Sequence, residues 1–324
     1  MKLLVIVNRL DELAPGQTTT MLARAAEDRG HTLYVAEATA VSLTSDNRLW
    51  ARVRQATPAP TPEAWVRQLR AAPADRMPLD GEALVWIRTN PGRDPRGGVH
   101  ATLLDLLAMA QEQGVTVVND PAALRSASTK LYLSRLPAHT RPQTTVSSDP
   151  ETIEALVRSA TGPMVLKPLS GSRGMDVFRV DPGQYANLNQ IIDVLVRGGV
   201  AMVQDYVPEA AEGDVRVVML NGEVLVAQGR AASVRRVPSG RDFRSNVHVG
   251  GRPAMAEYDD RLRAVAEAVG PVLRRDGLLL AGLDVIGDKV VEVNVFSTGG
   301  LVDGAAFYGV DFAQPIIAAL EALA

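Results

Sequence analysis

The feature that most restricts the fold is an uninterrupted apolar run at the start of the chain, residues 3–7. Such a run predicts a strand that is buried on both faces, as in a parallel sheet covered by helices, and it is too short for a signal-peptide core. A helix over residues 17–29 and a second strand over residues 32–36 follow. This strand–helix–strand order predicts an α/β fold that begins with a doubly wound sheet.

Further segments extend this first α/β unit. The sequence predicts a strand, a helix and a strand over residues 83–88, 100–113 and 115–119. Residues 41–82 give no clear pattern apart from a short helix. Three strands thus end at the polar residues Asn8, Arg88 and Asn119. Because ligands of open α/β sheets bind at such carboxyl ends, we expect a ligand there.

The composition narrows the class of protein further. The 324 residues carry a net charge of −3 and no strong basic run, so we expect no nucleic-acid partner. No apolar stretch approaches the ~18 residues of a membrane-spanning helix. Cysteine is absent, which removes disulfides and thiolate metal sites. We therefore expect a cytoplasmic protein that does not associate with a membrane.

The hairpin over residues 279–295 carries the strongest chemical signal. A three-residue loop at residues 287–289 would place Asp284 opposite Glu292, with Asn294 on the same face. Two facing carboxylates repel each other unless a cation compensates them, and hard oxygen ligands suit a Mg²⁺ ion that bridges phosphates. The pattern predicts a metal site, although a solvent-exposed acidic face has the same periodicity.

Lysine is rare in this chain, so each lysine is informative. The 34 basic residues include only four lysines. Lys167 ends an apolar strand over residues 164–168, where a buried lysine needs a partner, and a small-residue loop follows with Ser170, Gly171 and Gly174. Backbone N–H groups of such a loop can approach phosphate oxygens. Two glycines are also ordinary in a tight hairpin, and Lys130 alone fits an exposed helix face.

A second hairpin, residues 215–230, turns at residues 221–222. On a three-residue loop, four polar residues would share one face: Asp214, Arg216, Gln228 and Arg230. On a two-residue turn, Arg216 and Arg230 would point opposite ways; we favour the first pairing. Residues 231–253 hold five arginines and few apolar residues, which predicts a long loop that could close over a reactive intermediate.

In this order, the segments resemble the ATP-grasp superfamily, and most closely the prokaryotic glutathione synthetases. The resemblance covers nearly the whole chain and rests on residues 87–91 (IRTNP), 118–121 (VNDP), 165–169 (VLKPL), 204–208 (QDYVP), 213–216 (GDVR), 282–288 (GLDVIGD) and 292–294 (EVN). It implies an α/β substrate domain over residues 1–125. Two ATP-grasp subdomains that enclose the nucleotide would follow, a small lid over residues 126–205 and a metal- and substrate-binding part over residues 206–324.

The resemblance also implies the roles of individual residues. ATP would be bound by Lys130, Lys167, Ser170, Gly171, Gly174, Gln204, Asp205, Tyr206, Val207 and Asp214. One or two Mg²⁺ ions, for which Mn²⁺ can substitute, would be held by Asp284, Glu292 and Asn294. The acyl phosphate would meet Arg216, Arg230 and Arg244. The substrates would be bound by Arg88, Asn246, Ser297, Thr298, Gly299 and Gly300.

The chemistry implied by the resemblance is an ATP-dependent carboxylate–amine ligation through an acyl phosphate. The partners would be small-molecule carboxylates and amines, and related enzymes form dimers or tetramers. Glutathione synthesis from γ-glutamylcysteine and glycine is the favoured activity. Two alternatives stay open. Residues 242–251 are more similar to RimK-type peptide–glutamate ligases, and a nucleotide-binding module without ligase activity would share the fold.

Overall fold

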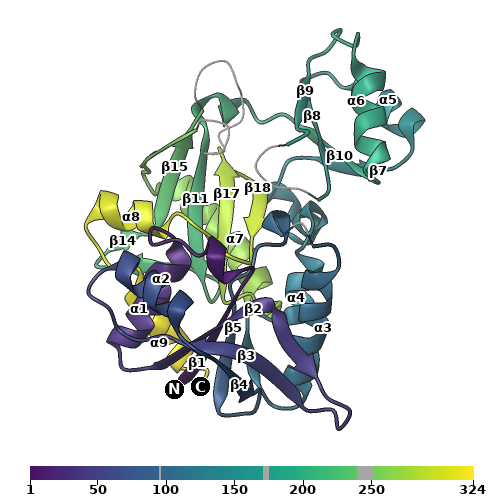
Figure 1. The fold of residues 1–324 in the computed structure, drawn as a ribbon. Helices are drawn as coiled ribbons and strands as arrows, with labels where there is room; N and C mark the ends of the chain where they lie inside the picture. The colour runs from purple at the N-terminus through teal and green to yellow at the C-terminus, as the bar shows by residue number, and fades with distance from the viewer. Residues whose placement is uncertain (95, 171–174, 239–250) are drawn as a thin grey trace.

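A computed structural model describes residues 1–94, 96–170, 175–238 and 251–324, and this part of the chain folds around three main sheets (Figure 1). The N-terminal sheet lies at the bottom of the view, the large C-terminal sheet above it and the small sheet at the upper right. The two termini lie close together at the bottom. None of the helices within these ranges is long and apolar enough to cross a bilayer.

The N-terminal sheet has the strand order β4-β3-β2-β1-β5-β6. Its strands are β1 (Lys2–Val7), β2 (Thr32–Leu43), β3 (Leu49–Gln55), β4 (Ala74–Pro78), β5 (Ala83–Ile87) and β6 (Thr116–Val118). The pairs of β1 with β2 and β5, and of β5 with β6, are parallel, as predicted. Leu4 and Ile6 of β1 join one hydrophobic core, and Leu3 and Val5 join another, because both faces of the sheet are covered.

For residues 41–82 the sequence pattern predicts one short helix and misses the strands. They contain the end of β2, all of β3 and β4, and helix α2 (Pro62–Ala71). β3 and β4 extend the sheet antiparallel to β2. In β3, buried Leu49, Ala51 and Val53 alternate with more exposed residues, among them Arg52. A strand with one buried face shows only this short alternation, which is a weaker signal than the continuous apolar run of a strand that is buried on both faces.

The helices of this domain differ in how they begin. Besides α2, the domain holds α1 (Thr18–Asp28), α3 (Val99–Glu112) and α4 (Pro121–Ser126). The side chains of Thr61 and Asp120 cap α2 and α4 by accepting a hydrogen bond from a first-turn N–H group. Gln17, the N-cap of α1, makes no such bond, and no acidic residue lies in the first turn of α1.

The small sheet has the order β7-β10-β8-β9 and packs against two helices (Figure 1). Its elements are β7 (Thr144–Ser147), α5 (Pro150–Ser159), β8 (Met164–Pro168), β9 (Phe178–Val180), α6 (Leu188–Arg197) and β10 (Ala201–Asp205). The sheet and helices bury a hydrophobic core of their own, with Ile153, Leu166 and Ile192 among its members. Short 3₁₀ turns at Lys130–Arg135 and Pro208–Glu212 flank this unit in the chain.

The large C-terminal sheet has the order β16-β15-β11-β17-β18, with β12 paired to β11. The elements of this region are β11 (Asp214–Leu220), β12 (Glu223–Val224), β13 (Val226–Ala227), β14 (Arg230–Ala231), β15 (Ser233–Val237), β16 (Arg252–Met255), α7 (Asp260–Arg275), β17 (Leu280–Ile286), β18 (Lys289–Asn294), α8 (Leu301–Tyr308) and α9 (Ala313–Glu321). The prediction of one loop over residues 231–253 is therefore wrong at both ends, which belong to β14, β15 and β16. Residues 239–250 lie outside the described ranges.

The register of the two hairpins tests the pairing arguments. Asp284 faces Glu292, as predicted, but the turn has two residues and a bulge between Asp284 and Val285 restores the pairing. The favoured pairing of the other hairpin is wrong. Leu220 pairs with Glu223 across a two-residue turn, in which Asn221 and Gly222 have φ values of 49° and 75°. Such φ values suit an Asn-Gly turn, and β11 then pairs onward with β15.

The N-terminal and C-terminal sheets share their cores. Each of the two larger hydrophobic clusters contains residues of both, for example Ile6 with Val217 and Leu3 with Val218. Asn119, at the end of β6, adds polar links. Its amide donates to the carbonyl oxygens of Leu280 (2.9 Å) and Val295 (2.7 Å) and accepts from the N–H of Leu280 (3.0 Å). These contacts hold the carboxyl edge of the N-terminal sheet against β17 and the end of β18.

Candidate active site

Two neighbouring cavities lie between the N-terminal sheet and β18. The first, of about 410 Å³, is lined by arginines of both sheets and by the loop after β1. The second, of about 450 Å³, lies beside Lys130 and Ser170. Glu292 and Asn294 line both cavities. Glu292 and Asn294 therefore lie between the arginine-rich cavity and the cavity beside Lys130. Two reactants, one in each cavity, would meet at this shared wall.

The predicted metal ligands meet on this wall. Asp284 is buried, Glu292 faces it across the hairpin, and the amide of Asn294 lies 3.3 Å from the Asp284 carboxylate. Burial and the neighbouring Asp284 raise the pKa of Glu292 above its ordinary value. No group of three or more acidic, histidine or cysteine side chains in metal-binding arrangement occurs among the described residues. Two carboxylates and an amide fit a cation whose remaining ligands come from substrate phosphates.

Asp284 is also clamped by two arginines. Arg216 binds both of its oxygens, at 2.7 and 2.8 Å, and Arg236 reaches it at 2.6 Å. Arg236 also pairs with the buried Asp214, so it bridges two acids. Burial alone would raise the pKa of Asp284, but the two arginines outweigh burial and hold it below its ordinary value. A cation that binds Asp284 must therefore compete with two guanidinium groups.

Arg236 lines the first cavity and contacts Asp284, and sequence reasoning did not single it out. The sequence predicts it within the long loop over residues 231–253, whereas it lies in β15 directly opposite Asp214. The apolar alternation of residues 232 and 234 is the signal that could have revealed the strand. Arg230, the predicted partner of Arg216, lies exposed in β14 and is not among the described residues that line either cavity. The three-residue loop predicted for the hairpin over residues 215–230, which is wrong, explains why Arg230 is expected to face Arg216.

The two lysines lie near Glu292 from the other side. Lys167 is buried at the end of β8, with its ammonium 3.5 Å from the carbonyl oxygen of Val291. Burial, and then the charge of Lys130, lowers the pKa of Lys167 to about 8. Burial also lowers the pKa of Lys130. The two ammonium groups repel each other, and an anionic phosphate chain bound near both would offset this repulsion.

Four predicted nucleotide-binding residues, at positions 204–207, lie at the end of β10 and directly after it. Gln204 is buried and donates to the Thr144 hydroxyl (2.8 Å), and Asp205 is exposed at the end of β10. The guanidinium of Arg179 lies 4.2 Å from the centre of the Tyr206 ring, and Val207 begins the turn that follows. Among the described residues, none of these four lines either cavity. Gly171, Gly174, Arg244 and Asn246 lie outside the described ranges.

Arg88 and the turn after β18 form the floor of the first cavity. Ser297, Gly299 and Gly300 line it, whereas Thr298 is buried beneath. Arg88 is 4% exposed, and its guanidinium donates to the carbonyl oxygens of Thr298 (3.1 Å) and Phe296 (3.5 Å). The predicted substrate residues at 88 and 297–300 are thus brought together, although more than 200 residues separate them.

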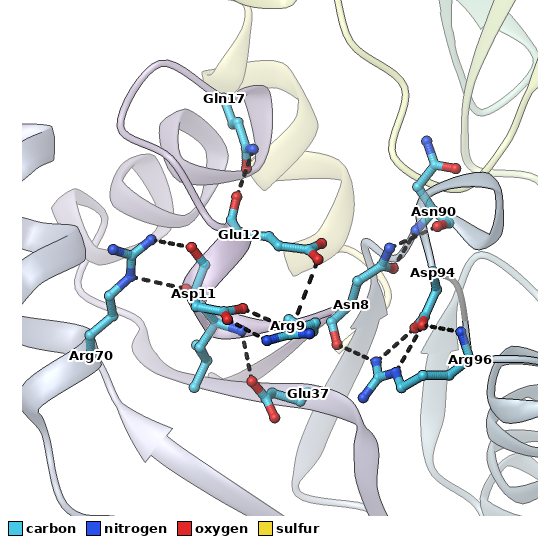
Figure 2. A network of polar contacts seen from close by, with 11 residues as sticks. Asn8, Arg9, Asp11, Glu12, Gln17, Glu37, Arg70, Asn90, Asp94 and Arg96 are labelled. Atoms are coloured by element: carbon cyan, nitrogen blue, oxygen red, sulfur yellow. Dashed lines mark hydrogen bonds and ion pairs between the residues drawn. The ribbon is translucent and has the colours of Figure 1, made fainter. Parts of the chain in front are cut away.

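The loop after β1 forms the N-terminal wall of the first cavity and begins at Asn8, one of the strand ends where the sequence predicts a ligand. The polar residues that follow Asn8 in this loop, drawn in Figure 2, are not singled out by the sequence. Asn8 exchanges hydrogen bonds with the backbone of Asn90, and Arg96 binds the carbonyl oxygen of Asn8. Arg9 and Glu12 also line the cavity; Arg9 precedes the 3₁₀ turn Leu10–Glu12, and Glu12 ends it. Their polar character after a buried strand is the only sequence signal, and it does not indicate which charge faces the cavity.

Comparisons with known proteins cover the whole chain. Residues 1–125 match the family model of the prokaryotic glutathione synthetase N-terminal domain, and residues 129–308 match the model of its ATP-grasp domain. The glutathione synthetase of Synechococcus elongatus is 36% identical over 338 residues, which cover 100% of this chain and 99% of that protein. The glutathione synthetase of Thermosynechococcus vestitus is 32% identical over 98% of this chain and 99% of that protein.

Solved structures agree on the fold. The D-cycloserine synthetase DcsG is similar with a TM-score of 0.66 and 17% identity, over 99% of this chain and 100% of that one. The ATP-grasp ligase PsnB, solved with a precursor variant, Mg and ADP, gives a TM-score of 0.65 and 18% identity over 99% and 98%. At such low sequence identity, the structural similarity concerns the fold alone, and it confirms the predicted ATP-grasp fold. With both family models and near-complete coverage of its relatives, the chain belongs to the prokaryotic glutathione synthetase family.

Proposed function

We propose that this protein is an ATP-dependent, ADP-forming ligase that joins γ-glutamylcysteine to glycine. One arrangement carries the proposal: an arginine-rich cavity and a cavity beside Lys130 meet at Glu292 and Asn294. Its relatives of matching length are named glutathione synthetases. A carboxylate substrate suits the arginines, a phosphate chain suits the lysines, and phosphoryl transfer needs the two to meet.

The residues on the shared wall fit a divalent cation, for which Mg²⁺ is the natural choice and Mn²⁺ a substitute. Asp284, Glu292 and Asn294 would hold one or two ions and so neutralise the charge of the transferred phosphoryl group. Glu292 and Asp284 are a like-charged pair in a buried setting, and this pair favours a cation between them. Lys130 and Lys167 would bind the ATP phosphates. Ser170 and residues 204–207 are proposed for the rest of the nucleotide, with the predicted glycines outside the described ranges.

The proposed reaction has two steps. A carboxylate oxygen of γ-glutamylcysteine attacks the γ-phosphorus of ATP, the bond to ADP breaks, and an acyl phosphate forms. The glycine amine then attacks the acyl carbon, inorganic phosphate leaves, and the amine gives up a proton. Arg216 and Arg236 face the first cavity and are positioned to stabilise the negative charge that develops on the acyl oxygen. Arg88 and residues 297–300 would bind substrate from the floor.

The test is an assay of ADP release with mass analysis of the product, across a panel of γ-glutamyl peptides and amino acids. Turnover should require ATP, a divalent cation, γ-glutamylcysteine and glycine together. Glu292→Gln keeps the side-chain shape and should abolish turnover while thermal stability is kept. Turnover with peptide and glutamate substrates but not with γ-glutamylcysteine would assign the protein to another carboxylate–amine ligation. Nucleotide binding without turnover of any pair would refute ligase activity. We further propose that the protein is cytoplasmic and that it forms a homo-oligomer. Sedimentation measures the oligomeric state.

A further inference from the structure

His100, near the start of α3, connects two turns that are far apart in the sequence. Its Nε2 atom and the hydroxyl oxygen of Thr89 are hydrogen-bonded at 2.7 Å. Its ring lies edge-on to the ring of Phe296, with the ring centres 4.7 Å apart and the planes at 80°. Thr89 lies in the turn after β5, and Phe296 lies in the turn after β18. His100 thus touches both turns, although it is not among the described residues that line either cavity.

These contacts close a ring that includes Arg88. Arg88 directly precedes Thr89 in the chain, and its guanidinium donates to the carbonyl oxygen of Phe296 at 3.5 Å. The backbone of Arg88 is therefore held through Thr89, and an acceptor of its side chain is held through Phe296, by the same imidazole. Asn90, which follows Thr89, lines both cavities, and Phe296 lines the second. A shift of either turn would therefore change the shape of both cavities.

The imidazole of His100 can make these contacts without carrying a charge. Burial lowers the pKa of His100 to about 4; the charge of Asp94 opposes this shift, and the charge of Arg125 adds to it. A neutral imidazole has one donor and one acceptor nitrogen, so it can bond a hydroxyl group. Thr89 is fully buried, so its hydroxyl could not turn to solvent if this hydrogen bond were removed.

The turn after β5 is also held from the side of β1 (Figure 2). Asn8 exchanges hydrogen bonds with the backbone of Asn90, at 2.8 and 2.7 Å, and Arg96 binds the carbonyl oxygen of Asn8. These contacts all lie within the N-terminal domain. The contact of His100 with Phe296 differs, because it extends to a turn that follows the C-terminal sheet.

We propose that His100 is a positioning residue, which holds the turn after β5 against the turn after β18 and so fixes the shape of both cavities. The inference rests on the proposed function, in which Arg88 and residues 297–300 bind an amino-acid substrate. A hydrogen bond fixes distance and direction, and a displacement of about 1 Å in a site can lower a rate about a hundredfold. His100 acts through Thr89 and Phe296 and touches no substrate itself.

The test separates positioning from stability. Thr89→Val and His100→Phe each remove one partner of the hydrogen bond and leave the other without it, so each should lower the melting temperature. The double variant replaces both partners by apolar groups of similar shape, so its melting temperature should return close to the wild-type value. Its kcat/KM for the amino-acid substrates should nevertheless stay about tenfold to a hundredfold below wild type, because the directional contact is still missing.

Two further variants serve as controls. Thr89→Ser keeps the hydroxyl group, so its kcat/KM should stay within about threefold of wild type. Thr140→Val removes another buried hydroxyl, which donates to the carbonyl oxygen of Pro137 at 2.9 Å, and should lower the melting temperature without lowering kcat/KM. Recovery of kcat/KM together with the melting temperature in the double variant would overturn the proposal, because stability alone would then explain the losses.

Hydrogen exchange gives a readout that needs neither substrate nor turnover. In the double variant, the backbone amides over residues 88–94 should exchange faster than in wild type, among them the N–H of Asn90 that donates to Asn8. The amides of α9 should exchange at the wild-type rate. Equal exchange over residues 88–94 in the two proteins would overturn the role of His100. Failure of wild type to join γ-glutamylcysteine and glycine would refute the proposed function, and the exchange rates would still decide whether His100 holds the turn.

Discussion

Asp284 is held by two arginines that come from different strands, Arg216 in β11 and Arg236 in β15. Both guanidinium groups line the first cavity, where they would be near a reacting carboxylate. Removing Arg236 would leave Asp214 buried without the arginine that pairs with it here. The chain also offers Arg230, an exposed arginine only six positions away. The two residues make a matched pair for mutation.

Arg236→Ala should lower kcat/KM by about a hundredfold to a thousandfold, because a preorganised charge near the acyl oxygen is lost. Arg230→Ala should stay within about twofold of wild type, as expected for a solvated side chain. Steady-state kinetics of both variants, with circular dichroism to check folding, decide the matter. Equal losses in the two variants would mean that the register of β11 with β15 does not define the site.

The lowered pKa of Lys167 predicts the direction in which the activity changes with pH. Its pKa is lowered to about 8, so the free enzyme loses this positive charge as pH rises through that value. Because phosphate binds the ammonium form, kcat/KM for ATP should fall above pH 8, approaching about tenfold per pH unit. Lys167→Arg stays charged, so its profile should be flat there, at a lower rate since the fork does not replace a point charge. A wild-type profile that stays flat to about pH 9.5 would contradict the assignment.

At the scale of elements, β17 passes close to the turn after β18. A Cβ added at Gly282 would lie 2.2 Å from the hydroxyl oxygen of Thr298 and 3.5 Å from Cδ of Arg216. The hydroxyl of Thr298 has no hydrogen-bond partner within the described ranges. Because the side chain is buried, it cannot move aside without disturbing its neighbours. Only glycine at position 282 lets the turn that forms the cavity floor lie this close to the sheet.

Gly282→Ala should therefore destabilise the protein by about 1–3 kcal/mol, the usual range for overpacking, and should also raise the KM values of the amino-acid substrates. Urea unfolding and kinetics measure the two effects. Gly162→Ala is the control, since a Cβ there meets nothing within 4 Å. It should change stability by less than about 1 kcal/mol in either direction. Similar behaviour of both variants would show that the turn adjusts freely.

At the scale of the molecule, the small sheet is packed differently from the other two. The N-terminal and C-terminal sheets share two hydrophobic cores, whereas the core formed by Ile153, Leu166 and Ile192 belongs to the small sheet and its helices alone. Polar contacts such as that of Lys167 with Val291 link it to β18. Without shared apolar packing, relative motion of such a unit is the default expectation.

We predict that ATP with Mg²⁺ draws the small unit toward β18, because the two proposed lysines would bind the same phosphates as the wall of the large sheet. The chain has no cysteine, so Glu151→Cys on α5 and Glu267→Cys on α7 give a clean pair of labelling positions. Energy transfer between dyes at these positions should increase on addition of ATP and Mg²⁺. Lys167→Ala with the same labels is the control and should show a smaller increase. No change in wild type at saturating ATP would contradict closure.

The sequence by itself determined the features that depend on local periodicity. Apolar runs predict the central strands, and the order of the two lysines is read directly from the chain. Turn residues a few positions away predict that Asp284 faces Glu292. The family resemblance carried the fold, which comparison confirms. The remaining site residues stay predictions, because neither the comparisons nor the fold tests their roles.

Only the tertiary structure decided which distant residues meet. It placed Arg236, and not Arg230, beside Asp214 and Asp284, because the chain beyond the Asn-Gly turn forms a new strand on β11 and does not continue the hairpin. It also placed Arg88 against Thr19 and Thr298, which lie 69 and 210 positions away. Periodicity describes how one segment faces its neighbours, whereas the packing of two sheets against each other depends on cores that the whole chain builds.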